Sequence, residues 1–415
     1  MTAKWRMGIS VALGLLRFLL KRRDGPDDPR SSMPMQTHTA LACQLWHRLV
    51  WIDFFAADPL TFTYGVLRIT RLSRPFPASK WHVLGLALIA VVFDALGMYR
   101  TALSLHSRAL RLAEHVADQS TLAHITFYRA MHCHAAGRWR EGLPYYDRAK
   151  TLSWQIGEIR LWAALTSNLV QHLYSLGEPG WIALPEQILG VAVETSDDQA
   201  KAWALSMTAI KEEHAGRHEA ALASLQKAMD VYEAIPDYRF LANALGLQCA
   251  NLKKLHRMDE GLLCAMRAEH LIRSHSLRGT WCTRPLLALA EARLAEFERS
   301  GLHQAETARA VRRMRRQGRE VRDEGAVECH RLEGEFEWLC GKHDRALACW
   351  DHGLAEAETL GARHAKARIL FQRGRRTGSP TDLDHAATLF EQCAATGELL
   401  ELQAHCNSGH AVAAA

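Results

Sequence analysis

The 415-residue sequence contains no apolar run long enough to cross a membrane. A spanning helix needs roughly 20 consecutive apolar residues. The two best candidates, residues 7–20 and 83–96, are shorter than this and contain Arg17 and Asp94. We also expect no cleavable secretory signal, because the basic cluster at residues 21–23 occupies the place of a small-residue cleavage site. We therefore expect a cytoplasmic protein, in which residues 83–96 form a buried helix.

Proline, strand-like patterns and paired cysteines are scarce as well. The 12 prolines fall mostly between periodic segments, and alternating runs of Val, Ile and Thr are nearly absent. Good helix formers such as Ala, Leu, Arg and Glu predominate, which indicates helices. The ten cysteines show no Cys-x-x-Cys spacing, which favours reduced thiols over a disulfide framework. The net charge of +6 permits attraction to nucleic acid or anionic membranes without requiring it.

Catalytic motifs are missing too. The sequence has no Gly-x-x-x-x-Gly-Lys phosphate loop, no Gly-x-Ser-x-Gly elbow and no His-Glu-x-x-His pair. We therefore expect no enzyme activity and no cofactor. An enzyme whose site is assembled from residues distant in sequence remains an alternative.

The most metal-like cluster is His132-Cys133-His134. Adjacent residues of a helix point about 100° apart, so only spacings of three or four converge on one ion. The positions four residues away from His132 hold Tyr128 and Ala136, which are not usual metal ligands. We therefore expect no metal site, and a metal protein using the His132 region is the alternative.

What the sequence does contain is a repeat of short turns. Glycines in these turns are separated by 40, 40 and 39 residues, and after an equivalent turn without glycine at His256 the motif returns. The glycines are Gly97, Gly137, Gly177, Gly216 and Gly341. A fixed period of this size predicts a solenoid of helix pairs.

The residues that follow each turn are also alike. A small residue stands five positions after the glycine and another stands seven positions later, where two helices can approach closely. The small residues are Ala102 and Ala109, Gly142 and Ala149, Ala221 and Ala228, and Ala346 and Gly353.

The segment at residues 137–149 resembles the turn and second helix of the tetratricopeptide (TPR) repeat family almost position by position. The period of about 40 exceeds the usual 34. Longer repeats of this kind are similar to the C-terminal TPR arrays of bacterial STAND-class signal-transduction ATPases. The resemblance implies an all-α, right-handed solenoid that binds a protein or an extended peptide on its concave face. That face would be lined by the first helix of each pair.

The repeat divides the chain into four parts. Residues 1–23 are an amphipathic lead-in helix that docks on protein or lies on a membrane surface, and residues 24–37 are a linker. Residues 38–406 form the array, and residues 407–415 are a frayed tail. We expect nine helix pairs, at roughly 38–74, 80–117, 119–157, 158–195, 197–235, 238–276, 280–320, 322–361 and 362–396.

Polar and aromatic residues on two successive first helices are candidates for partner binding. Such a mixture suits an extended peptide, because amides pair with peptide backbone and aromatic rings offer contact area. The candidates are Arg129, His132, Trp162, Asn168, Gln171 and Tyr174. The alternative is that Trp162 and Tyr174 pack between helices. Trp162 and Asn168 also lie roughly 120° apart around their helix, so the whole set cannot face one partner.

A run of arginines marks a second candidate surface. Seven arginines fall between residues 309 and 322, and four of them share one helix face. The run comprises Arg309, Arg312, Arg313, Arg315, Arg316, Arg319 and Arg322. Three interpretations are open: a solvated face with local salt bridges, an acidic protein partner, or nucleic acid. Interleaved aromatic residues for base stacking are missing from the run.

These observations favour a non-catalytic protein- or peptide-binding scaffold or sensor in a bacterial regulatory pathway. The alternative is a regulator that contacts nucleic acid or an anionic membrane. It would use the arginine helix at residues 309–322 and the basic N-terminal helix, which would place the protein peripherally on a membrane.

Overall fold

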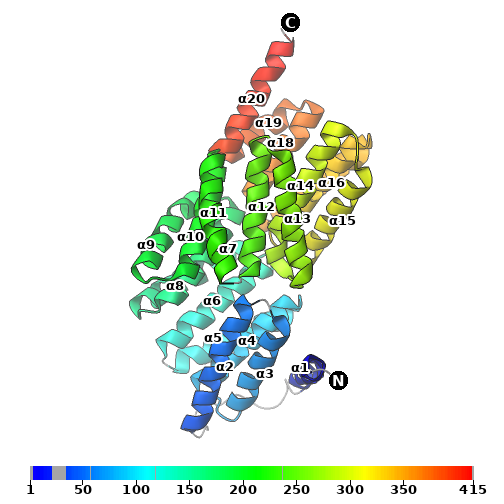
Figure 1. Cartoon of the computed structure of the whole chain (residues 1–415). Helices are drawn as coiled ribbons and strands as arrows, with labels where there is room; N and C mark the ends of the chain where they lie inside the picture. The colour runs from blue at the N-terminus through cyan, green and yellow to red at the C-terminus, as the bar shows by residue number, and fades with distance from the viewer. Residues whose placement is uncertain (1–2, 21–33, 57, 117, 236, 414–415) are drawn as a thin grey trace. The chain divides into compact units, whose positions relative to one another are not determined.

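The computed structural model describes residues 3–20, 34–56, 58–116, 118–235 and 237–413 (Figure 1). In these ranges the chain forms 20 α-helices and short 3-10 segments, and it forms no strand. The expected all-α class is therefore confirmed. Most of the predicted linker at residues 24–37 lies outside the described residues. None of the described helices has the length and apolar character that a membrane span requires.

The chain divides into two compact units. Unit 1 comprises residues 1–136 and 141–165, and unit 2 comprises residues 137–140 and 166–415. The helices that lie mainly in unit 1 are α1 (Ala3–Leu20), α2 (Thr37–Phe55), α3 (Pro59–Ser73), α4 (Lys80–Ala95), α5 (Tyr99–Val116), α6 (Gln119–Ala135) and α7 (Trp139–Gln155). Helix α8 (Ile159–Leu176) begins in unit 1 and ends in unit 2.

Unit 2 continues the succession of helix pairs. Its helices after α8 are α9 (Leu184–Glu194), α10 (Asp198–His214), α11 (His218–Ala234), α12 (Tyr238–Lys254), α13 (Met258–Ser274), α14 (Thr283–Ser300), α15 (Gln304–Glu320), α16 (Glu324–Leu339), α17 (His343–Leu360), α18 (Arg363–Thr377), α19 (Pro380–Gln392) and α20 (Thr396–Ala413). The nine pairs from α2–α3 to α18–α19 match the expected ones within the described residues. Helix α20 continues to Ala413, past residue 406 where the array was expected to end.

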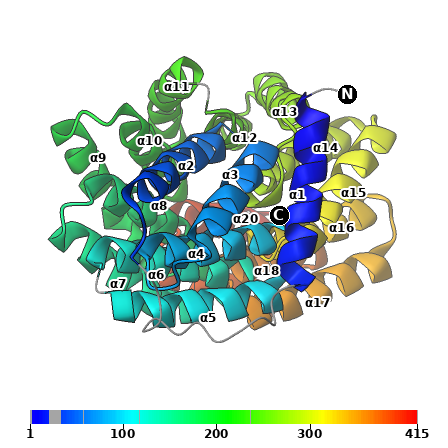
Figure 2. The same cartoon turned by 90° about the horizontal axis from the view of Figure 1, so that it is seen from below.

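The lead-in helix α1 packs on α3 within unit 1 (Figure 2). A Cβ atom on Gly14 would lie 2.8 Å from Leu67 Cδ1, so the glycine permits a close approach. Docking on protein was one of the two expected roles for this helix. Its exposed residues Ile9, Leu13 and Leu16 leave the membrane contact as a prediction.

Helix α4 supplies the centre of the unit 1 core. Twelve of its residues between Trp81 and Phe93 are buried, which confirms the expected buried helix. Ser79 caps its N-terminus by accepting a hydrogen bond from the backbone N–H of His82. A helix that is apolar on nearly all sides needs neighbours around it, and α3, α5 and α6 all contact α4.

The turns between paired helices depend on a left-handed backbone. Gly137 and Gly216 have φ values of +72° and +76°, which let each first helix end and the chain reverse. At the equivalent turn without glycine, His256 adopts a φ of +59°. The small residues after the turns, including Ala221 and Ala346, are fully buried as their spacing predicts.

A close approach between α16 and α17 shows how tightly one pair is packed. Trp350 is fully buried, and its Nε1–H donates a hydrogen bond of 3.2 Å to the Arg331 carbonyl. Its indole lies over Gly334, where a Cβ atom would lie 2.4 Å from Trp350 Nε1. Any side chain at residue 334 therefore has to displace the indole.

We predict that Gly334→Ala lowers the free energy of unfolding by about 1–3 kcal/mol, because it overpacks this contact. Gly190→Ala is the matched control, since nothing lies within 4 Å of a Cβ atom at that helical position. Helix propensity should leave this control neutral or about 1 kcal/mol more stable. Urea unfolding measures both values, and an unchanged Gly334→Ala variant would contradict the packing described.

Candidate functional site

Unit 2 brings together turns that are about 180 residues apart in sequence. Trp139 Nε1–H donates a hydrogen bond of 3.2 Å to the Arg322 carbonyl, across 183 residues. Arg363 donates from Nε to the Leu176 carbonyl at 3.2 Å and from Nη2 to the Gly177 carbonyl at 3.1 Å. We call these contacts the seam: the turns after α6, α8 and α10 meet the beginnings of α16, α18 and α20.

The third contact of the seam joins α10 to α20. His214 Nε2–H donates to the Cys393 carbonyl at 3.0 Å. Beside it, a Cβ atom on Gly397 would lie 2.7 Å from Gly216 N and 2.9 Å from Gly216 Cα. Two glycines thus allow backbone to approach backbone, and the seam consists largely of polar and backbone contacts.

Aromatic and charged side chains gather on the inner side of the seam. The Tyr174 ring centroid lies 5.8 Å from that of His214 and 5.3 Å from that of His364. The Arg284 guanidinium lies 5.3 Å from the Tyr174 ring centroid, a cation–π distance. His364 Nε2 lies 3.0 Å from Glu398 Oε1. Together with Glu213, these residues form what we call the inner cluster.

The inner cluster contains two carboxyl groups that are not fully satisfied. Oε2 of Glu213 and Oε2 of Glu398 are both buried and have no hydrogen-bond partner. Burial raises the pKa of Glu213, despite the nearby Arg284. Burial would also raise the pKa of Glu398, but the interactions with His364 and His214 lower it to about 2. Such unsatisfied buried acceptors are costly, at about 1–3 kcal/mol each.

Ion pairs link the first helices next to the inner cluster. Glu291 of α14 pairs with Lys253 of α12 at 2.5 Å, with Arg368 of α18 at 2.6 Å, and with Arg331 of α16. Glu328 of α16 pairs with Arg368 at 3.0 Å and with Arg331 at 2.5 Å. Burial would raise the pKa of Glu291, but the three cations hold it well below its ordinary value. We call this network the charge ladder.

Neither the inner cluster, apart from Tyr174, nor the charge ladder was predicted from the sequence. A signal was nevertheless present, since Lys253, Glu291 and Arg331 recur at intervals of 38 and 40 residues. Charges that recur with the repeat period occupy equivalent positions on successive first helices. Their signs alternate, so neighbouring helices can form ion pairs.

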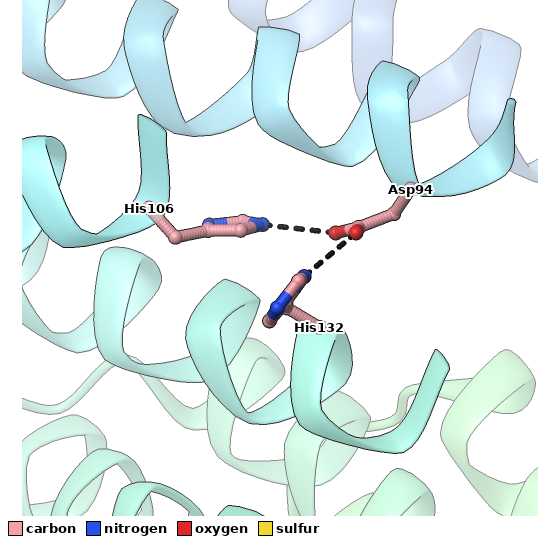
Figure 3. A group of neighbouring side chains, drawn as sticks. All are labelled: Asp94, His106 and His132. Carbon is pink, nitrogen blue, oxygen red and sulfur yellow. Dashed lines mark hydrogen bonds and ion pairs between the residues drawn. The ribbon is translucent and has the colours of Figure 1, made fainter. Parts of the chain in front are cut away.

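Unit 1 holds a separate buried group at the junction of three helices (Figure 3). Asp94 of α4 lies 3.0 Å from His106 Nε2 of α5 and 2.7 Å from His132 Nδ1 of α6. Both imidazoles are buried, and each donates to a different oxygen of the carboxylate. Burial lowers the pKa of His106. For Asp94, burial acts to raise the pKa, but the two histidine hydrogen bonds bring it below its ordinary value.

Comparison with known proteins identifies solved structures of similar fold but no relative by sequence. No family profile and no curated protein matches the sequence. A Rap protein complexed with Competence and Sporulation Factor has 13% identity and a TM-score of 0.63, covering 88% of this chain and 99% of that one. The apo form of RapI has 12% identity and a TM-score of 0.52, covering 67% and 98%. The chain is a TPR-like α-solenoid.

A third match has a lower TM-score. It is a STAND protein with a tetratricopeptide repeat sensor from Pyrococcus horikoshii, with 13% identity and a TM-score of 0.45. The match covers 76% of this chain and 47% of that one.

The six partner-binding candidates of this TPR-like solenoid fall in both units. Tyr174 belongs to the inner cluster, and Asn168 and Gln171 are half-buried on the same helix. Trp162 is only 5% exposed and lies 5.3 Å from Trp154, measured between ring centroids. Trp162 therefore packs against Trp154 of the neighbouring helix, and a role of Trp162 in partner binding stays a prediction.

The two remaining candidates are buried in unit 1. His132 belongs to the group with Asp94, which its own helix could not reveal because the partners come from α4 and α5. Arg129 lies 5.3 Å from the Tyr145 ring centroid and is 7% exposed. A role of these residues in partner binding stays a prediction.

The arginine run on α15 is divided between paired and exposed residues. Arg313 pairs with Glu269 and Arg315 with Glu333, and Arg316 pairs with Glu320 at 2.8 Å. Three others are exposed and make no ion pair with any residue that the structure describes. They are Arg309, Arg312 and Arg319. Local salt bridges thus compensate part of the run, and contact with an anionic partner stays a prediction.

Several histidines of the solenoid make stability dependent on pH. Burial is the main cause that lowers the pKa of His47 to about 3, and it lowers that of His172 to about 4. His47 Nε2 also accepts a hydrogen bond from Trp51 Nε1–H, which requires an unprotonated nitrogen. With folded-state pKa values below the ordinary 6.5, the unfolded chain binds more protons. The contribution of these histidines to stability is therefore fully present above about pH 6.5 and declines as the pH falls below it. The buried Asp323, whose pKa burial raises to about 7, acts in the opposite direction, but it is outnumbered by the buried histidines with lowered pKa values.

We predict that the thermal midpoint falls between pH 7.5 and pH 5, with each such histidine contributing on the order of 1–2 kcal/mol. His47→Gln should weaken this dependence, whereas a variant at the exposed His385, His385→Gln, should retain it. Thermal unfolding followed by circular dichroism measures the midpoints. Equal midpoints at the two pH values in the wild type would contradict the prediction.

Proposed function

We propose that the chain is a non-catalytic regulatory module that binds a protein or an extended peptide on the first helices of unit 2. The observation that carries this proposal is the chemistry of that face. Tyr174, Arg284 and Arg368 come from three different first helices and lie with acidic side chains on one side of the helix pairs. Aromatic and arginine side chains are the types that dominate binding energy at protein interfaces.

The charge ladder also supports a binding role, because burying its charged side chains costs desolvation free energy that the fold does not need to spend. Buried ion pairs contribute little net stability, and apolar residues of similar volume often do as well or better. A solenoid needs only apolar contacts between its helices, so the ladder is not required by the fold. Donors and acceptors held in place by ion pairs are, in contrast, well suited to recognising a peptide backbone and its charged side chains.

The polar character of the seam supports a regulatory role. Hydrogen bonds from Trp139, His214 and Arg363 to backbone carbonyls can exchange with water at small net cost. A seam of this kind can open to admit a partner and close again. A Rap protein of the same fold was solved in complex with Competence and Sporulation Factor, which supports a bound partner. We place the chain in a bacterial signal-transduction pathway on these grounds.

Selection from a random peptide display library tests this function. Full-length wild-type chain should enrich peptides that bind it, and Arg284→Gln should weaken their binding about 10- to 100-fold, because a charged hydrogen-bonding group is lost. Gln171→Ala tests the part of the face that the sequence predicted. Leu263→Ala is the matched control, since this exposed leucine lies on the second helix α13.

Fluorescence anisotropy with the selected peptides measures the dissociation constants, and circular dichroism verifies that each variant is folded. Equal affinities for wild type, Arg284→Gln and Leu263→Ala would contradict the proposed face. Salt-dependent binding of DNA or anionic vesicles that is lost on replacing Arg309, Arg312 and Arg319 would instead favour the alternative surface on α15.

A further inference from the structure

Three metal-ligating side chains meet at the seam from helices that are far apart in sequence. They are His214 of α10, His364 of α18 and Glu398 of α20. One ligand atom from each lies within 4.8 Å of the others. The two imidazole ring centroids are 5.0 Å apart, and both histidines are buried at about 5% exposure.

We propose that His214, His364 and Glu398 bind one zinc ion. Two imidazoles and one carboxylate are a ligand set that zinc uses where a fourth position remains for water or another group. The spread of the three ligand atoms is small enough for side-chain rotations to bring them around one ion. The inference goes beyond the proposed partner binding and does not depend on it.

The unsatisfied carboxylate oxygens are a second, independent observation. Glu398 has a buried Oε2 without a partner, and Glu213, next to His214 in the chain, has another. The two carboxyl groups also repel each other electrostatically. A zinc ion would supply positive charge that these carboxylates lack.

The nearby cations are already engaged with other carboxylates. Arg284 pairs with Glu324 at 3.5 Å, and Arg368 pairs with Glu291 and Glu328. Neither arginine donates a hydrogen bond to the free oxygens of Glu213 and Glu398 in the described part of the chain. The negative charge at the three ligands is therefore only partly compensated.

The hydrogen bond of His214 fixes the ring tautomer that a metal ligand needs. A carbonyl can only accept, so His214 Nε2 carries the proton that it donates to the Cys393 carbonyl. In the neutral ring this leaves Nδ1 unprotonated, which a metal ligand requires. Metal-binding histidines usually donate their other N–H to a carbonyl or a carboxylate in the same way.

The group in unit 1 has a similar composition but differs in its carboxylate, although His106 Nδ1 there is buried without a hydrogen-bond partner. Both oxygens of Asp94 accept hydrogen bonds from His106 and His132. We therefore assign zinc to the seam and not to this group, which provides a matched control.

Zinc at the seam would link α20 to α10 and α18 through its three ligands. It would thereby stabilise the closed arrangement of unit 2, because an ion bound to the closed form shifts the equilibrium toward that form. A bound metal ion would also give the carboxylate of Glu398, one oxygen of which has no hydrogen-bond partner, a coordinate bond.

Zinc titration of the full-length, chelator-stripped chain tests this inference. Competition with a chromophoric chelator restricts the measurement to tight sites and excludes weak binding by exposed histidines. We expect one equivalent of zinc in the wild type and in His106→Gln. His364→Gln and Glu398→Gln should each bind zinc at least tenfold more weakly. Zinc should also raise the thermal midpoint of the wild type and of His106→Gln only.

Glu398→Gln keeps the volume of the side chain, so it serves as the decisive variant if His364→Gln does not fold. Absence of tight zinc binding by the wild type would overturn the inference. Loss of zinc in His106→Gln but not in Glu398→Gln would overturn it as well, by moving the ion to unit 1. Unchanged affinity in Glu398→Gln would have the same consequence.

Discussion

The seam of unit 2 is the constraint on which the proposed sites depend. Turns about 180 residues apart can meet only if every intervening helix pair advances by a matching rotation. The near contact of Gly397 with the Gly216 backbone, and the hydrogen bonds of Arg363 to two carbonyls, define how the turns meet when the seam is closed. Because the seam closes, side chains from α8, α10, α14, α18 and α20 gather in one cluster.

The helix pairs could be predicted from the sequence because their causes are local. A left-handed glycine such as Gly137 ends one helix, and small residues such as Ala221 allow the next to pack. The seam could not be predicted in this way, because it depends on small rotations summed over several repeats. The sequence singled out Tyr174 as a candidate for partner binding, and that role stays a prediction. The contacts of Tyr174 with His364 and Arg284 follow from the seam.

The group around His132 could not be predicted from its own helix either. The positions around His132 on its own helix offer no metal ligand. Asp94 and His106 reach it from two other helices, at a sequence separation of 38 residues for the aspartate. In a solenoid the nearest neighbours of a side chain stand about one repeat away. Spacing rules for a single helix therefore miss polar groups that a search at the repeat period would find, as it would for Lys253, Glu291 and Arg331.

Carbodiimide cross-linking followed by mass spectrometry tests the seam most directly. Lys254 Nζ lies 2.5 Å from both carboxylate oxygens of Glu401, and both side chains are partly exposed, so the reagent can join them with a zero-length amide. Lys366 and Glu358, 2.6 Å apart and only eight residues apart in sequence, provide a local control. We expect a Lys254–Glu401 cross-link within monomeric chains, at a yield comparable with that of the control. A clear Lys366–Glu358 product without the Lys254–Glu401 product would contradict it.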